Sequence, residues 1–119
     1  NVDELGQFGQ LIANGGEYNG KRIVSEDYIK EMTTSYYETG EYIPNNTPVK
    51  ANYGYQIWID KLNRAVYMWG IFGQYCIVMP EKNIVITVLS LEQTDGGSNG
   101  NYETSPLRKI IWEDLVTQF

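Results

Sequence analysis

Few side chains in this sequence could attack a substrate. Nucleophilic acyl transfer needs an activated serine, cysteine or threonine, a base within hydrogen-bond reach, and donors for the developing oxyanion. The one cysteine, Cys76, lies in an apolar run, and the 119 residues contain no histidine that could lower its pKa. We therefore expect Cys76 to be a buried structural thiol rather than a nucleophile.

The residue types and their spacing do not favour a metal site, a glycosidase site or a nucleic-acid-binding surface. With no histidine and one cysteine, only carboxylates could bind a metal, and their spacing does not match a calcium-binding loop. The carboxylates also fall at predicted helix ends, turns and helix surfaces, which does not suit a catalytic pair. A net charge of −6 argues against a surface that neutralises phosphates. We expect no metal, no cofactor and no nucleic-acid partner.

The most informative segment is 67–88, which alternates apolar runs with glycines. Gly70 and Gly73 flank Ile71 and Phe72. Because glycine has no side chain, this spacing lets a ligand or another chain segment approach the main chain around Ile71. A bulge or strand corner without a chemical role is the alternative interpretation. We expect Gln74 to bond neighbouring backbone.

Helices are predicted before this segment. Apolar residues at helical spacing predict a first helix that buries Leu5, Phe8, Leu11 and Ile12 and ends at Gly15-Gly16. Ser25 is the predicted N-cap of a second helix, which ends near Thr34 and buries Tyr28, Ile29 and Met32. Residues 35–52 are rich in turn-forming residues and predict a surface loop.

An antiparallel meander is predicted next. Its strands are expected at 53–60, 64–69, 74–80 and 83–91, with turns at 60–63 and 80–83, the second of which places Asn83 in the left-handed region. Residues 92–104 predict a polar loop. Ser105-Pro106 starts a closing helix whose predicted apolar stripe is Leu107, Ile110, Ile111, Leu115 and Phe119.

These elements predict the α+β class. An antiparallel sheet of three to four strands needs helices over one face to bury its apolar residues, and the closing helix is the natural cover. The expected organisation of residues 1–119 is one partial domain. It comprises a helical pair at 1–34, a loop at 35–52, the sheet at 53–91, a polar loop at 92–104 and a helix at 105–119.

Four blocks resemble, in order, the C-terminal part of the β-lactamase-related serine hydrolases. That family includes class C β-lactamases, penicillin-binding DD-peptidases, esterases and 6-aminohexanoate-dimer hydrolases. The blocks are Asp3–Leu11, Gly15–Ser25, Tyr53–Ile59 and Gly70–Gln74 with Pro80-Glu81-Lys82. The resemblance implies a β-lactamase/transpeptidase-like fold that lacks two N-terminal strands here, one of which would pair with the edge of 83–91. Because an open apolar edge attracts a partner, we expect self-association or a covering loop there.

The family's catalytic motifs are only partly represented. Ser-x-x-Lys and Tyr-x-Asn do not occur in these residues, and the third motif, Lys-Thr-Gly or His-x-Gly, corresponds to Met68-Trp69-Gly70. The resemblance places the backbone N–H of Ile71, beside Gly70, as an oxyanion-hole donor. Met68 lacks the family's cation, and Phe72 stands where some relatives carry histidine. These departures put β-lactam and peptidoglycan-stem recognition in doubt and favour a neutral ester or amide substrate.

The expected function follows from this resemblance. The chain would be the C-terminal portion of a serine hydrolase that forms an acyl-serine, with its nucleophile and base upstream, and alone it would be inactive. Tyr53, Trp58, Trp69 and Phe72 are candidate walls of the substrate cleft. Family analogy favours a location outside the cytoplasm. The alternative is a non-catalytic module that binds a partner strand or a glycan through its aromatic residues, and core packing explains most of the aromatic content.

Overall fold

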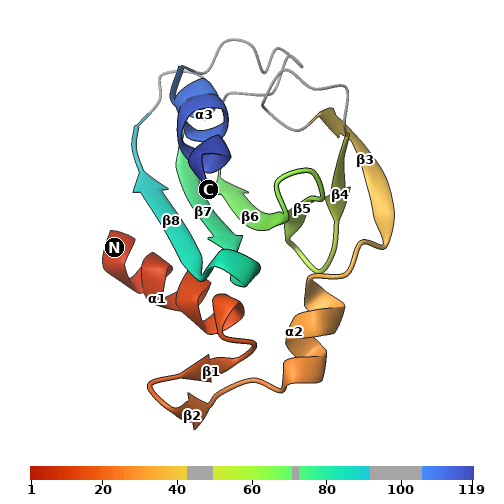
Figure 1. Ribbon diagram of the computed structural model, residues 1–119, viewed down its shortest axis with the longest axis vertical. Helices are drawn as coiled ribbons and strands as arrows, with labels where there is room; N and C mark the ends of the chain where they lie inside the picture. The colour runs from red at the N-terminus through yellow and green to blue at the C-terminus, as the bar shows by residue number, and fades with distance from the viewer. Residues whose placement is uncertain (43–49, 71–72, 92–105) are drawn as a thin grey trace.

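A six-stranded antiparallel sheet organises the chain in this computed structural model, which describes residues 1–42, 50–70, 73–91 and 106–119 (Figure 1). The strands neighbour one another in sequence order. They are β3 (Tyr37–Tyr42), β4 (Lys50–Tyr53), β5 (Trp58–Asp60), β6 (Ala65–Gly70), β7 (Gln74–Met79) and β8 (Ile84–Leu89). A separate hairpin contains β1 (Glu17–Tyr18) and β2 (Lys21–Arg22). The predicted α+β class and meander are confirmed, but the sheet is larger than the three to four strands expected.

The predicted surface loop over 35–52 is wrong where β3 and β4 lie. Tyr37 pairs with Tyr53, and Glu38 pairs with Asn52. Aromatic and β-branched residues suit a pleated surface, and this preference outweighs the turn-forming residues nearby. The central part of that predicted loop, residues 43–49, and the predicted polar loop over 92–104 lie outside the described residues.

The single strand predicted over 53–60 is two strands, β4 and β5. The chain turns between them, where the Gly54 N–H donates to the Ile57 carbonyl at 2.8 Å and Gln56 has a φ of 57°. Gly54 has no room for a side chain, because an added Cβ would meet the Met32 carbonyl oxygen. This glycine therefore lets the chain reverse against the end of the second helix.

The other predicted turns are present. Pro80–Lys82 forms a short 3₁₀ turn, after which Asn83 has a φ of 54° and donates its N–H to the Pro80 carbonyl at 3.1 Å. In the turn after β5, the fully buried Asp60 carboxylate accepts hydrogen bonds from the Asn63 backbone N–H at 2.9 Å and its side-chain Nδ2 at 2.6 Å. These local bonds fix the connections between the strands.

Two helices pack on one face of the sheet (Figure 1). They are α1 (Val2–Ala13), capped by Asn1, and α2 (Glu26–Met32), whose predicted N-cap Ser25 accepts from the Tyr28 N–H at 3.2 Å. Their apolar side chains join a core that contains Ile12, Ile29, Met32, Ile57, Ile59, Val66, Cys76 and Val78. The prediction that Phe8 and Tyr28 are buried is wrong, since they are 45% and 49% exposed.

The closing helix covers the opposite face, so helices lie on both faces of the sheet rather than on the one expected. It runs as α3 (Pro106–Lys109), a π-helical segment η3 (Ile110–Leu115) and a 3₁₀ turn η4 (Val116–Gln118). Its buried residues are Arg108, Ile111, Trp112 and Val116. They pack on a core that includes Tyr67, Tyr75, Ile77 and Met79.

The predicted apolar stripe of this helix is wrong at Ile110, Leu115 and Phe119, which are 54%, 37% and 47% exposed. Trp112 decides the buried face instead. Its ring packs edge-on against Tyr67 at 5.0 Å between centroids, and its Nε1 donates to the buried Asp60 carboxylate at 3.3 Å. A tryptophan buries more apolar area than isoleucine or leucine, and here its polar N–H also finds an acceptor.

Candidate functional site

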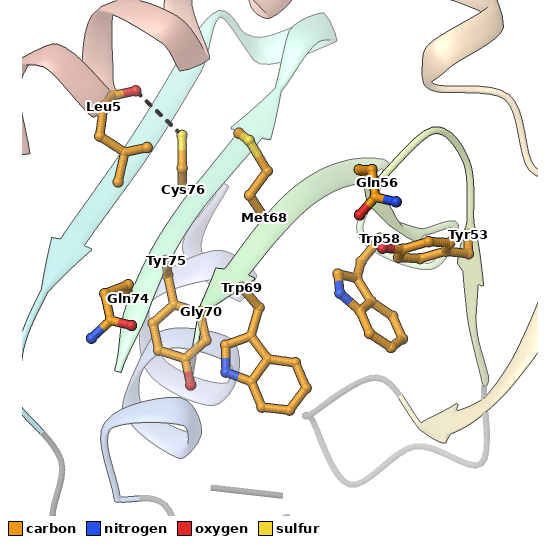
Figure 2. A pocket seen from close by; sticks show the side chains of 10 residues that line it. All are labelled: Leu5, Tyr53, Gln56, Trp58, Met68, Trp69, Gly70, Gln74, Tyr75 and Cys76. Atoms are coloured by element: carbon orange, nitrogen blue, oxygen red, sulfur yellow. Dashed lines mark hydrogen bonds between the residues drawn. The ribbon is translucent and has the colours of Figure 1, made fainter. Parts of the chain in front are cut away.

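A hollow of about 270 Å³ lies at the end of β6 (Figure 2). Side chains from α1, from the β4–β5 turn and from strands β4 to β7 surround it. The described residues that line it are Leu5, Tyr53, Gln56, Trp58, Met68, Trp69, Gly70, Gln74, Tyr75 and Cys76. The site therefore combines residues from both halves of the chain.

The hollow forms because β6 is longer than its neighbour β5. The paired register of these two strands starts at Asp60–Ala65 and ends at Trp58–Tyr67. β6 continues through Met68 and Trp69 to Gly70, where it pairs with β7. The turn after β4 takes the chain away at this point, so the last residues of β6 border open space.

Three aromatic side chains form a continuous wall beside this strand end. Tyr53 contacts Trp58 edge-on at 5.0 Å between ring centroids, and Trp58 contacts Trp69 at 6.0 Å with the rings tilted by 56°. All three side chains are half-buried. Figure 2 shows the rings of Trp58 and Trp69 on the same side of β6, and Met68 on the other.

Arg108 of α3 lies against this wall. Its guanidinium carbon is 4.3 Å from the centroid of the Trp69 ring, and the residue is only 2% exposed. A guanidinium at this distance from an indole is attracted to the ring, more strongly where water is excluded. The closing helix thus helps to hold Trp69 in place.

A small hydrogen-bond network shapes the start of β7. Gln74 Nε2 donates to the Ser90 carbonyl at 3.3 Å, as expected for a side chain that bonds neighbouring backbone. The Ser90 N–H and Oγ–H both donate to the Gly73 carbonyl, at 3.1 and 3.0 Å. A Cβ on Gly70 would lie 2.7 Å from Gln74 Oε1, and Gly73 has a φ of 96°. The positive φ of Gly73 favours glycine there, whereas the contact at Gly70 involves the flexible end of the Gln74 side chain, which can move aside.

Cys76 closes the hollow on the α1 side. It is 1% exposed, and its thiol donates a weak hydrogen bond to the Leu5 carbonyl at 3.6 Å. Burial raises the pKa of the thiol to about 11, so it stays protonated near neutral pH. The prediction of a buried structural thiol is confirmed.

The structure brings four of the six predicted site residues together. Tyr53, Trp58, Trp69 and Gly70 all line the hollow. Ile71 and Phe72 lie outside the described residues, so the amide assigned to the oxyanion hole has no described position. Sequence reasoning missed Leu5, which reaches the site only through the long-range packing of α1. It also missed Gln56, which lies in the β4–β5 turn where a continuous strand was expected.

The described residues contain no cluster of three or more histidine, cysteine, aspartate or glutamate side chains that could hold a metal ion. Among them, no helix has the length and apolar character needed to span a bilayer.

Comparison with solved structures finds a hydrolase. The chain is similar to "Putative 6-aminohexanoate-dimer hydrolase from Bacillus anthracis", with a TM-score of 0.57 and 28% sequence identity over 75% of this chain. The chain covers 22% of that protein, about a fifth of its length. No known family model matches the chain, and no curated protein matches it. The structural likeness suggests a β-lactamase-like relationship.

Proposed function

We propose that this chain is the C-terminal part of a β-lactamase-related serine hydrolase that cleaves an ester or amide through an acyl-serine. One observation carries the proposal. Met68-Trp69-Gly70, which the resemblance aligns with the family's third motif, borders a hollow at the end of β6, beyond its pairing with β5. The structural likeness to a hydrolase over most of the chain supports it. Family analogy adds a location outside the cytoplasm.

The proposed role of the chain is to stabilise negative charge and to shape the cleft. The backbone N–H of Ile71 would donate to the oxyanion, and Gly70 would give the substrate access to the main chain. A main-chain donor does not depend on side-chain identity, so isoleucine can fill this position. Loss of one such donor typically lowers kcat by about 10²–10³-fold.

The nucleophile and general base would come from elsewhere in the protein. These 119 residues contain no Ser-x-x-Lys, and the nearest sequence, Ser105-Pro106-Leu107-Arg108, opens the closing helix. Without a nucleophile and base the acyl-enzyme cannot form. The 119-residue chain alone should therefore be catalytically inactive.

Active-site labelling tests the proposal. The longer protein predicted here should react covalently with a fluorophosphonate and hydrolyse a nitrophenyl ester. Alanine in place of the Ser-x-x-Lys serine should abolish both. The control is Ser25→Ala, because Ser25 caps α2 and does not line the hollow. A protein that neither labels nor hydrolyses the ester, or that still labels without that serine, would refute the proposal.

A group of exposed tyrosines favours a second candidate, a non-catalytic binding module. Tyr36 and Tyr55 stack at 5.3 Å between centroids with an interplanar angle of 8°, and Tyr28 contacts Tyr55 at 6.2 Å. Tyr36 is 52% exposed, Tyr55 44% and Tyr28 49%. Flat exposed rings suit a sugar or a peptide. A longer sequence without Ser-x-x-Lys would favour this candidate.

A further inference from the structure

We propose that the hollow at the end of β6 is a subsite for an uncharged, flat group, such as the aromatic part of an ester or amide. The role of this subsite in catalysis rests on the proposed hydrolase function, but its binding preference can be measured whether or not the protein is a hydrolase. Three features of the hollow lead to this proposal: its aromatic wall, its size and the absence of charged side chains among the described residues that line it.

The wall offers faces to a flat ligand. Tyr53, Trp58 and Trp69 are in successive contact and only half-buried, so part of each ring remains available to a ligand. Aromatic groups gain from offset or edge-on packing with such rings. A hollow of about 270 Å³ is slightly smaller than a typical drug-sized pocket and suits one ring with a short substituent.

The described lining carries no charged side chain. Its polar members are two tyrosines, Gln56 and Gln74, together with the indole N–H groups. A carboxylate or ammonium that entered would lose hydration without gaining an ion partner, which is unfavourable. Arg108 does not belong to the lining and lies against the Trp69 ring. The hollow should therefore discriminate by charge as well as by shape.

Three matched probes test this preference on the 119-residue chain. Phenylacetamide is neutral, phenylacetate is an anion and benzylammonium is a cation at about pH 7. Binding is followed by two-dimensional NMR of the indole N–H signals of the three tryptophans. Phenylacetamide should shift the Trp58 and Trp69 signals. Trp112, which belongs to the buried face of the closing helix and is 1% exposed, provides an internal control and should not move.

The expected affinity for phenylacetamide is roughly millimolar, and both charged probes should bind roughly tenfold more weakly. The cation separates the hollow's own chemistry from the chain's net charge of −6, which would favour benzylammonium. Equal binding of all three probes, tightest binding of either charged one, or no shift of Trp58 and Trp69 would overturn the proposal.

Three substitutions test whether phenylacetamide binds in the hollow. Trp58→Leu should weaken phenylacetamide binding roughly tenfold, whereas Tyr28→Leu removes an exposed aromatic outside the lining and should leave it unchanged. Gln56→Lys places a cation on an exposed lining residue, so folding is not at risk, and should reverse the preference in favour of phenylacetate. An unchanged preference in Gln56→Lys would contradict the assigned site.

The result is independent of the labelling experiment. A longer protein that labels with fluorophosphonate while the chain ignores phenylacetamide would refute this subsite and leave the hydrolase proposal intact. Selective binding of phenylacetamide together with a failure to label would keep the subsite and refute the hydrolase.

Discussion

At the scale of single residues, burial keeps the Cys76 thiol protonated. Cys76 lies on β7 beneath α1, and removal from water raises the pKa of its thiol from the ordinary value of 9.0 to about 11. In the unfolded chain the thiol would regain its ordinary pKa. Folding therefore favours the protonated form, and this contribution to stability is complete below about pH 9.

Alkaline pH should accordingly destabilise the wild-type chain through Cys76. Between about pH 9 and 11 the unfolded state loses its thiol proton while the folded state retains it, so the free energy of unfolding should fall. Urea unfolding of wild type and of Cys76→Ala at stepped pH measures this. The wild type should lose more stability over this range than the variant, which lacks the titrating group. Parallel pH profiles would show that the thiol is not desolvated.

At the scale of the elements, α1 lies unusually close to the sheet at Gly9. A Cβ at Gly9 would be 2.5 Å from Val85 Cγ1 and 2.8 Å from Cys76 Sγ. At Gly6, one turn earlier, the nearest atoms of Thr87 are 3.8 Å away, an ordinary contact distance. The two glycines of one helix thus differ in whether the packing needs them.

We predict opposite effects for alanine at these two positions. Gly9→Ala should lower the free energy of unfolding by about 1–3 kcal/mol, because α1 must move away from β7 and β8. Gly6→Ala should leave stability unchanged or raise it by up to about 1 kcal/mol, because alanine favours the helix. Urea denaturation of the two variants gives both values. A Gly9→Ala variant as stable as Gly6→Ala would show that the helix is not held by this contact.

At the scale of the whole molecule, β8 is the last strand of the described sheet. Its side chains are mostly half-buried, and the residues at and beyond its end include Leu89 and Leu91, which are 48% and 90% exposed. Because the backbone edge of such a strand can pair with another strand, we propose that two copies of the isolated 119-residue chain associate through residues 83–91, the edge that an N-terminal strand of the proposed longer protein would cover.

Sedimentation should therefore show a concentration-dependent dimer. The double variant Leu89→Lys/Leu91→Lys should weaken dimerisation roughly tenfold or more, because lysine on an edge strand opposes pairing. The double variant Ile23→Lys/Leu62→Lys, which places the same added charge on two other exposed apolar residues, is the control and should not alter it. A wild-type chain that stays monomeric at all concentrations, or equal effects of the variants, would refute association through β8.

Local patterns in the sequence were sufficient to predict several structural features of this molecule. The Ser25 cap, the turn at Pro80–Asn83 and the apolar run of β7 each depend on residues close together in the chain, and all three are present. Such features follow from backbone dihedral preferences and nearby hydrogen bonds. The order of the four family-like blocks also indicated the relationship that the structural comparison now supports.

Other parts depended on contacts between distant residues. The buried face of the closing helix follows from Trp112, whose partner Asp60 is 52 positions earlier in the sequence. The hollow exists because β5 ends its pairing at Tyr67 while β6 continues, and because Leu5 of α1 packs beside it. Neither the register of neighbouring strands nor the approach of a helix is encoded in a short window of sequence, since both result from the packing of the whole core.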